Sequence, residues 1–377
     1  MAKNKKIRTE FRKNRTARAR ATDLTRDLQD TSKDSADSSR HERISGKGDL
    51  SRKRTVVGET VTDDSSSGFT VMPEVDLSVC RRGRVLQVFG LNSLIETEDG
   101  AQHQCVVRRL LKTLATDQRH VVAAGDWVYF RPSSPTEGII ERIEPRYGIL
   151  SRTSRGRQHI MVANVDQMIV VASAAEPYLK PHLIDRFIVT AEQNQLRPII
   201  CINKIDLVDV ADLQPLIGAY SRMGYRVIPI SAQTGQGIDL LASELRNQAT
   251  VVVGQSGVGK SSLLNRIEPG LELRVGKVSQ ESQKGKHTTT TARLIRLERG
   301  GWVVDTPGIR QFQLWDIIPE EVAGNFRDLR PYVSRCKYPN CIHIHETDCA
   351  VKDAVADGYL DSRRYESYCQ MHEEDSS

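Results

Sequence analysis

The fold is decided by the stretch Gly254-Gln255-Ser256-Gly257-Val258-Gly259-Lys260-Ser261, which fits the pattern Gly-x4-Gly-Lys-Ser/Thr of a phosphate-binding loop. The β-branched run at residues 250–253 predicts a buried strand before it, and residues 261–266 predict the start of a helix after it. Glycines let the backbone wrap closely around a phosphate, so that successive N–H groups and the helix N-terminus face it. We therefore expect an α/β nucleotide-binding domain. A glycine-rich turn without a ligand is the alternative.

The polar residues of this loop have separate expected roles. Lys260 would reach the β and γ phosphates and is a candidate catalytic residue, and Ser261 would bind Mg²⁺ through its hydroxyl. Ser262, at the start of the helix, completes the expected nucleotide-binding stretch. A phosphate-binding loop alone does not distinguish ATP from GTP.

A second motif, Asn203-Lys204-Ile205-Asp206, predicts which base is bound. It follows an apolar run at residues 197–202 that predicts a strand, and open α/β sheets bind ligands at the C-terminal ends of their strands. The Asp206 carboxylate can accept two hydrogen bonds from the N1–H and amino group of guanine, which adenine cannot donate in that arrangement. Two such bonds, at about 1.5–3 kcal/mol each, give about a hundredfold discrimination or more. Lys204 would lie along the base plane.

Another short strand is predicted at residues 227–230, and it ends at Ser231-Ala232. The backbone of Ser231 and Ala232 is suited to contact the guanine O6. A tetrapeptide such as Asn-Lys-x-Asp is weak evidence by itself. The joint occurrence with the phosphate-binding loop is a strong indication of a guanine nucleotide site.

The triphosphate sensors are expected after the phosphate-binding loop. A predicted strand at residues 302–304 ends at Asp305-Thr306-Pro307-Gly308, where Asp305 would hold Mg²⁺ through water and the Gly308 N–H would sense the γ-phosphate. Thr288 or Thr289, within a run of four threonines, is the expected second Mg²⁺ ligand. A β-branched strand entry is the alternative interpretation of these threonines.

The motifs occur in an unusual order. The guanine-reading motif comes first, the phosphate-binding loop second and Asp305-Thr306-Pro307-Gly308 last, whereas the phosphate-binding loop leads in an ordinary GTPase. This order predicts a circularly permuted GTPase domain.

Two departures from common GTPase patterns bear on catalysis. Ile309 stands where many GTPases carry the glutamine that orients the attacking water, so we expect slow intrinsic hydrolysis. His287 is the nearest candidate to replace that glutamine, because a neutral imidazole can orient or deprotonate water. A purely structural role for His287 is equally open. Gly257 occupies the position of the asparagine found in potassium-activated GTPases, which argues against a catalytic potassium ion.

Four soft ligands predict a metal site near the C-terminus. Cys336, Cys341, His343 and Cys349 have the spacing Cys-x4-Cys-x-His-x5-Cys, which is typical of one tetrahedral, structural zinc ion. His345 could replace His343 if both lay on the same side of a strand. The alternative is a chance cluster of reduced cysteines. The remaining cysteines are scattered, and we interpret them as reduced thiols of a cytoplasmic protein.

Together these residues resemble the RsgA family of small-ribosomal-subunit-dependent GTPases, also called YjeQ. The resemblance rests on residues 203–206, 254–262, 285–289 and 305–309 and on the cysteine cluster. It implies an N-terminal OB-fold β-barrel, an α/β P-loop GTPase domain in permuted order and a C-terminal zinc-binding domain with helices. It also implies a role in late maturation of the small ribosomal subunit, with GTP hydrolysis to GDP and phosphate stimulated by that particle and contact with its rRNA.

The chain is expected to divide into four segments: a disordered basic arm (1–75), an OB-fold barrel (76–153), the permuted GTPase domain (154–315) and a zinc-binding helical domain (316–377). Five short β-rich runs between residues 84 and 143 suit a small barrel independently of the resemblance. Its arginines indicate RNA contact, although such a charge run is more often a solvated surface. A helix is predicted around residues 184–194, and others at 319–329 and 362–371.

Composition agrees with an RNA-rich partner. The chain of 377 residues has a formal net charge of +6, and its basic, Ser/Thr/Asp-rich N-terminal arm suits binding to a phosphate backbone. An organelle transit peptide is the rival interpretation of the arm. No apolar run approaches the roughly 20 residues needed to span a bilayer. We expect a monomer without a membrane association.

Two other function classes remain open at this stage. One is a GTP-dependent RNA-binding switch whose hydrolysis is incidental, and the other is a GTPase that acts on a different RNA. Lys260, Ser261 and Asp305 favour Mg²⁺-dependent turnover over the first. The barrel and the cysteine cluster favour the small ribosomal subunit over the second by family analogy only.

Overall fold

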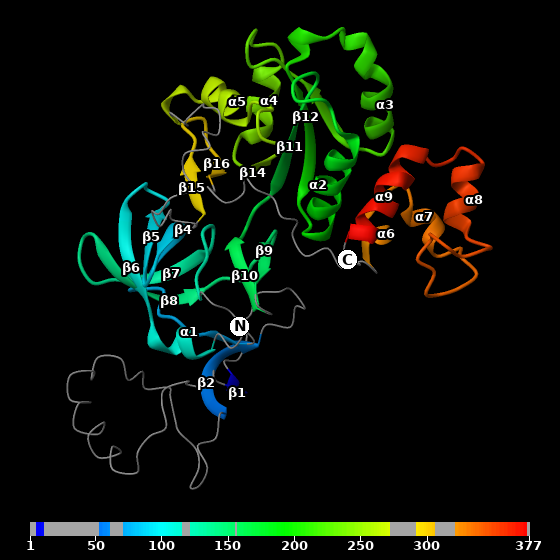
Figure 1. The fold of residues 1–377 in the computed structure, drawn as a ribbon. Helices are drawn as coiled ribbons and strands as arrows, with labels where there is room; N and C mark the ends of the chain where they lie inside the picture. Colours follow the sequence, from blue (N-terminus) through cyan, green and yellow to red (C-terminus); the bar gives the residue numbers. More distant parts are fainter. Residues whose placement is uncertain are drawn as a thin grey trace, which may run out of the picture. The chain divides into compact units, whose positions relative to one another are not determined.

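The computed structural model describes residues 5–10, 53–60, 71–114, 121–154, 157–271, 292–305 and 321–374. The chain forms two compact units. The first comprises Met1–Tyr147 with Thr153–Ile160, and the second comprises Gly148–Arg152 with Met161–Ser377 (Figure 1). Among the described helices, none is both long and apolar enough to cross a membrane.

Part of the N-terminal arm forms strands, which differs from the expected disorder over residues 1–75. Strands β1 (Lys5–Glu10), β2 (Lys53–Thr60) and β3 (Val71–Pro73) make a three-stranded sheet in the order β1-β2-β3. The β1–β2 pairing is antiparallel, with Ile7 opposite Val56. The β-branched residues Thr55, Val56 and Val57 explain this difference, because they favour extended backbone within an otherwise polar segment.

The rest of the first unit is the predicted five-stranded barrel. Its elements are β4 (Arg81–Phe89), β5 (Asn92–Thr97), β6 (Gln102–Val107), α1 (Arg109–Leu114), β7 (Trp127–Pro132) and β8 (Glu137–Ile143). The sheet closes through an antiparallel β4–β7 pairing, β6 runs parallel to β8, and the helix follows the third strand. This connectivity is that of an OB-fold, as predicted. Val85, Ile95, Phe130 and Ile140 fill the interior without exposed surface.

The second unit contains the predicted α/β domain. The strands are β11 (Gln167–Ser173), β12 (Arg197–Asn203), β13 (Arg226–Pro229), β14 (Ala249–Val253), β15 (Arg293–Arg296) and β16 (Trp302–Asp305), in the sheet order β13-β12-β11-β14-β16-β15. All neighbours are parallel except β15 and β16. The strand before the phosphate-binding loop, β14, therefore lies in the middle of the sheet although it is the fourth of these six strands in chain order. A short pair, β9 (Leu150–Ser154) and β10 (Arg157–Val162), precedes this sheet.

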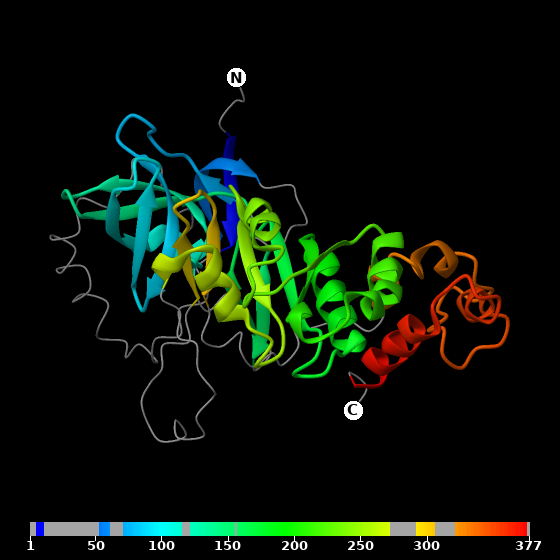
Figure 2. The ribbon, with the colours of Figure 1, turned by 90° about the horizontal axis from the view of Figure 1, so that it is seen from above.

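Helices cover both faces of this sheet: α2 (Pro181–Gln193), α3 (Gln214–Arg222), α4 (Ile238–Leu245) and α5 (Lys260–Ile267) (Figures 1 and 2). Leu241 of α4 and Leu263 of α5 pack with Ile169, Ile199 and Ile228 in one buried cluster. These strand positions alternate with Val170 and Ile200, which are also buried, so both faces of the sheet are apolar. Burial on both faces explains why the strands have continuous hydrophobic runs.

A helical module follows the described part of the sheet. It contains α6 (Val322–Asn325), α7 (Arg330–Val333), α8 (Ala350–Ala356) and α9 (Ser362–Glu374). The predicted helix at 362–371 is confirmed, but the single helix predicted at 319–329 is wrong within the described residues. There the helix ends at Asn325, Phe326 is extended, and α7 begins at Arg330 with Pro331 in its first turn. At this break in the helical path Phe326 is fully buried in the module core.

One buried ion-pair network joins this module to α2. Arg364 of α9 donates to Asp185 of α2 at 2.6 Å and to Asp328 at 2.9 and 3.1 Å. The Tyr220 hydroxyl of α3 also donates to Asp185, at 2.7 Å. The Arg364 side chain is 4% exposed and that of Asp185 is 1% exposed. Pairing and hydrogen bonds offset the cost of burying these charges, and α2 and α9 thereby pack side by side (Figures 1 and 2).

Candidate functional site

Asn203 connects three of the predicted motif segments. It is the last residue of β12 and is 1% exposed. Its side-chain amide nitrogen donates to the Val258 carbonyl of the phosphate-binding loop at 2.8 Å, and its amide oxygen accepts from the Ala232 N–H at 3.1 Å. The structure thus brings together the Asn-Lys-x-Asp motif, the Ser231-Ala232 turn and the phosphate-binding loop at one edge of the sheet.

Ser231 fixes the carboxylate of Asp206. The Ser231 hydroxyl donates to one Asp206 oxygen and accepts the Thr234 N–H at 3.0 Å. Ser231 is fully buried, whereas Asp206 is exposed. A carboxylate held at one oxygen keeps its other oxygen and remaining lone pairs for two neighbouring N–H donors. This arrangement is chemically suited to reading a guanine edge.

Two glycines of the phosphate-binding loop are required by close backbone approach. A Cβ on Gly254 would lie 2.1 Å from the Val171 carbonyl oxygen, and one on Gly259 would lie 2.4 Å from the Asn203 amide nitrogen. Both have positive φ angles, 141° and 94°. The side chain of Val258 anchors the loop in the domain core at 2% exposure. The glycine contacts with Val171 and Asn203 and the burial of Val258 together hold the turn in one conformation.

The charge of Lys260 lies within this loop. Its ammonium donates to the carbonyl oxygens of Gly254 and Gln255 at 2.7 and 2.8 Å. Helix α5 begins at Lys260, so its first N–H groups, which have no carbonyl partner within the helix, lie next to the loop. Together they form a cationic cradle that can hold phosphate oxygens.

Asp305 lies at the C-terminal end of the strand next to β14. It ends β16, which runs parallel to β14, the strand that leads into the phosphate-binding loop. Both strands therefore deliver their C-terminal residues to the same edge of the sheet. The other sensor candidates, His287, Thr288, Thr289 and Gly308, lie outside the described residues, as does Ile309.

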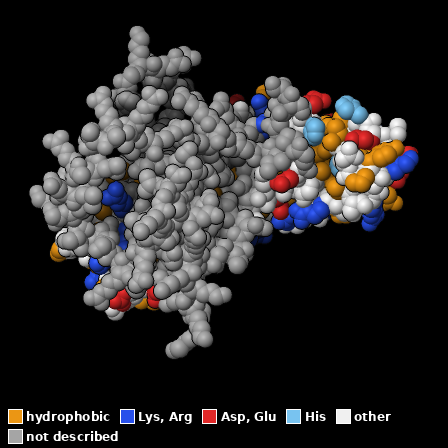
Figure 3. All heavy atoms as spheres, turned by 90° about the horizontal axis from the view of Figure 1, so that it is seen from below, with side chains coloured by type: hydrophobic (Ala, Val, Ile, Leu, Met, Phe, Trp, Pro, Cys, Tyr) orange, Lys and Arg blue, Asp and Glu red, His pale blue; other side chains and the backbone are white. Residues whose placement is uncertain are grey.

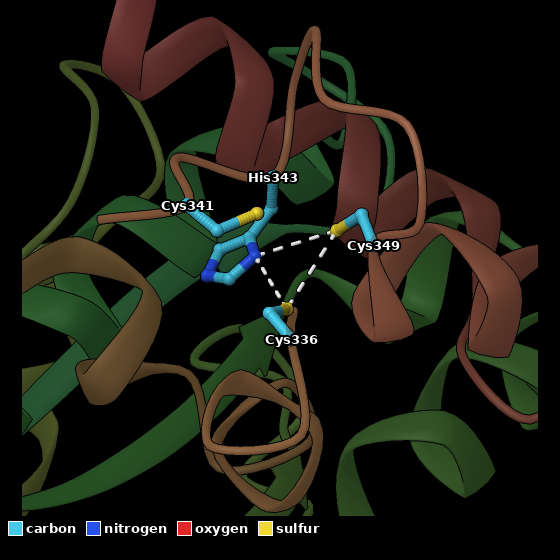
Figure 4. Close-up of side chains that lie close together, drawn as sticks. All are labelled: Cys336, Cys341, His343 and Cys349. Atoms are coloured by element: carbon cyan, nitrogen blue, oxygen red, sulfur yellow. Dashed lines mark hydrogen bonds between the residues drawn. The ribbon is translucent and has the colours of Figure 1, made fainter. Parts of the chain in front are cut away.

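The four predicted metal ligands converge in the C-terminal module (Figure 4). One ligand atom each from Cys336, Cys341, His343 and Cys349 lies within 4.8 Å of all the others. The His343 Nδ1 is 3.3 Å from the Cys336 sulfur and 3.5 Å from the Cys349 sulfur, and these sulfurs are 3.9 Å apart. A tetrahedron around zinc with Zn–S bonds of about 2.3 Å has edges of about 3.8 Å. The donor set and spacing therefore fit one four-coordinate metal ion.

His343, and not His345, faces the cysteines. The expected strand is absent here, because the described backbone from Cys341 to Cys349 is a loop. His343 adopts a left-handed conformation with φ of 59° and is buried, whereas His345 is exposed. In a strand, His343 and His345 would point to the same side. The left-handed backbone at His343 removes that alternation, so the two histidines are not equivalent. Burial lowers the pKa of His343, which favours the neutral imidazole that a metal requires.

Side chains that the sequence pattern did not reveal hold this loop. The Glu346 carboxylate accepts the N–H groups of Ile342 and Ile344 at 2.7 and 3.1 Å. From α9, the hydroxyls of Tyr365 and Tyr368 donate to the carbonyls of His343 and Ile342 at 2.7 and 2.6 Å. The two tyrosines stand three residues apart on one helix, and that spacing was the only available signal.

This fold and site define a circularly permuted P-loop GTPase, an enzyme that hydrolyses GTP. The family model described as RsgA GTPase matches residues 143–315. The chain belongs to the RsgA family. The small ribosomal subunit biogenesis GTPase RsgA of Yersinia enterocolitica is 37% identical over 317 residues, which cover 80% of this chain and 88% of that protein. The protein of that name from Chromohalobacter salexigens is 40% identical over 295 residues, covering 76% and 84%.

Solved structures agree with this assignment. YjeQ from Thermotoga maritima superposes with a TM-score of 0.65 at 36% identity and covers 78% of this chain and 98% of its own. YloQ, described as a circularly permuted GTPase, gives a TM-score of 0.63 at 30% identity, covering 80% and 97%. The permuted order predicted from the motifs is thereby confirmed.

Proposed function

We propose that this GTPase binds the small ribosomal subunit and acts in its late maturation, hydrolysing GTP to GDP and phosphate under stimulation by that particle. The observation that carries the proposal is the contact of Asn203 with both Val258 and Ala232, which assembles a guanine site in the permuted order. The relatives' name, small ribosomal subunit biogenesis GTPase, supplies the particle.

In this proposal the nucleotide contacts follow the sheet edge. Asp206 accepts hydrogen bonds from the guanine N1–H and amino group, Lys204 lies along the base, and Ser231-Ala232 contacts the O6 through its backbone. Residues 254–262 wrap the phosphates, with Lys260 against the β and γ groups. The clustering of these residues by Asn203 and by the Ser231–Asp206 hydrogen bond supports these roles.

We place Mg²⁺ at the cradle, held by Ser261 and, through water, by Asp305, with Thr288 or Thr289 and Gly308 closing over the γ-phosphate. Hydrolysis forms a bond from a water oxygen to the γ-phosphorus and breaks the bond to the β–γ bridging oxygen, which leaves with GDP. Positioning and charge stabilisation supply most of the catalysis of such a transfer. His287 is the candidate that orients the water, and Lys260 the residue that stabilises charge on the phosphates.

We assign one structural zinc to the Cys336, Cys341, His343 and Cys349 group. All four positions around the ion are filled by the protein, so none is left for water or substrate. The metal would fix the loop between α7 and α8 and hence the surface of the C-terminal module. The lack of an open position supports a structural role for the metal and argues against a catalytic one.

Cationic and aromatic side chains on both units support an RNA partner. On the barrel, the guanidinium of the exposed Arg82 lies 4.3 Å from the centre of the Trp127 ring. In the C-terminal module, Arg335 lies 5.4 Å from the Tyr332 ring. Lysine and arginine side chains are visible at this end of the chain among hydrophobic ones (Figure 3). Such pairs can stack bases and contact phosphates.

The decisive experiment measures GTP hydrolysis by the full chain alone, with purified small subunits and with large subunits. Selective stimulation by small subunits is the expected result. Stimulation by large subunits alone, or equal stimulation by both, would contradict the assigned partner. A Lys260→Ala variant provides the control, because it should not hydrolyse GTP under any of the three conditions.

A further inference from the structure

One carbonyl oxygen beside the guanine site accepts from two side chains. The Ser173 hydroxyl donates to the Glu176 carbonyl at 3.0 Å, and the Lys204 ammonium donates to the same oxygen. Ser173 is the last residue of β11 and is 2% exposed, whereas Glu176 is exposed. A buried hydroxyl therefore holds the acceptor that in turn holds a lysine of the base-reading motif.

The segment that carries this carbonyl lies between the two halves of the nucleotide site. Ser173 pairs with Asn203 in the parallel β11–β12 ladder, and the Ala174 N–H donates to the Asn203 carbonyl at 2.8 Å. Three residues on, the ring of Pro177 would lie 3.7 Å from a Cβ built on Gly257 of the phosphate-binding loop. Residues 174–177 thus extend from the end of the base-reading strand to the phosphate-binding loop.

We propose that Ser173 is a positioning residue for guanine nucleotide binding and acts on Lys204 through the Glu176 carbonyl. This inference rests on the role proposed above for Lys204. A lysine has a long side chain that loses conformational freedom when it is held in one place. Lys204 begins from a left-handed backbone with φ of 64°, and the fixed carbonyl defines where its ammonium ends. The hydroxyl of Ser173 removes the freedom of that carbonyl before the nucleotide binds.

The experiment is a double-mutant cycle on GDP affinity, measured by calorimetry with the full chain. Removal of the Ser173 hydroxyl in Ser173→Ala should weaken GDP binding by about two- to tenfold, the usual net effect of one hydrogen bond. In a Lys204→Ala background the same change should have no effect, because the residue on which Ser173 acts is gone. Ser243→Ala is the matched control, since its hydroxyl also donates to a main-chain carbonyl, at 2.6 Å on α4.

Each other result has a definite meaning. Equal weakening in both backgrounds, or none in either, would overturn the positioning role and leave the guanine site intact. No weakening by Lys204→Ala itself would overturn the assignment of Lys204 and the inference with it. If Ser173→Ala does not fold, Ser173→Thr and Ser173→Val provide the same comparison, because they have nearly the same shape and only threonine keeps the hydroxyl. The Ser173→Thr protein should then bind GDP more tightly than the Ser173→Val protein.

Discussion

The guanine edge of the sheet and the metal cluster of the C-terminal module are built in opposite ways. At the guanine edge, Asn203 bonds to residues 29 and 55 positions away in the sequence. In the metal cluster, all four ligands come from one segment between Cys336 and Cys349. The first site exists only because parallel strands end at a common edge. The second needs one loop and an ion.

This difference predicts different modes of failure. The guanine edge is held by many hydrogen bonds and by buried strands, so loss of one contact weakens it without dismantling the sheet. The metal cluster would concentrate much of its stabilisation in a single ion, with the Glu346 carboxylate and the α9 tyrosines as the other supports of the loop. The helix tyrosines that brace the loop act only after α9 has folded.

The largest expected effect is loss of the metal. Structural zinc contributes about 10–16 kcal/mol to the folding of small zinc-binding units. His343→Ala should release the metal and raise hydrogen exchange across the loop and α8, while GDP affinity changes by less than about threefold because the sheet edge is separate. Metal content and hydrogen exchange provide the measurements.

His345→Ala is the matched control for this variant, since that histidine is exposed and outside the cluster. It should retain the metal in full. Metal loss in His345→Ala, or a stoichiometric metal in His343→Ala, would show that the ligand set has been assigned wrongly.

The next effect concerns the buried ion-pair network that joins α9 of the C-terminal module to α2 of the nucleotide-binding domain. Arg364→Met removes one partner from a buried network and leaves Asp185 and Asp328 without their cation, which costs about 3–5 kcal/mol. Arg363→Met is the control on the same helix. Its guanidinium pairs with Asp361 at the surface, at 2.6 Å, where an ion pair contributes about 0–1 kcal/mol. Chemical unfolding of both variants should differ accordingly, and equal unfolding curves would mean that the network does not stabilise the packing of α9 on α2.

Sequence patterns predicted the parts that local chemistry determines. The phosphate-binding loop, the base-reading motif and the cysteine cluster each need particular residue types at short spacing. The barrel strands and sheet strands were predicted from short apolar and β-branched runs. The predicted interval 227–230 is shifted by one residue from β13 (Arg226–Pro229), because Arg226 pairs in the ladder although it is polar and the pairing ends at Pro229.

The buried ion pair between α9 and α2 could not be predicted, because Arg364 and Asp185 are 179 positions apart. An arginine in an amphipathic helix is ordinarily exposed, and only tertiary packing reveals that Arg364 is buried. The sequence predicted His343 as the ligand, as the cluster bears out, but it left His345 open as a substitute for a related reason. The choice between the two histidines depended on one positive φ angle, and histidine carries no strong signal for that conformation.

A smaller effect tests the guanine edge alone. Asp206→Asn replaces an acceptor by an amide that presents a donor to guanine, and should lower the preference for GDP over xanthosine diphosphate by about a hundredfold. Asp209→Asn is the nearby control, because the Asp209 carboxylate accepts the Ala211 N–H at 2.9 Å and caps the short helical turn at Val210–Leu213. Unchanged selectivity in Asp206→Asn would remove that residue from base recognition. Metal content should stay complete in both variants.

The smallest expected effect comes from the cap of α9, the helix whose tyrosines hold the metal loop. Asp361 accepts the Arg363 N–H at 2.9 Å at the start of α9, and Asp361→Ala should cost about 0.5–2 kcal/mol, as for other helix caps. The side-chain hydrogen bond from Arg363 lowers the pKa of Asp361 below its ordinary value. Because the folded pKa is the lower one, this stabilisation is complete above the unfolded value of about 3.9 and is lost as the pH falls through the folded value. Urea unfolding should therefore separate Asp361→Ala from the unmodified chain at pH 6, and the difference should shrink as the pH falls below about 3.9. A difference that persisted undiminished in acid would show that the charge of the Asp361 carboxylate has no part in starting α9.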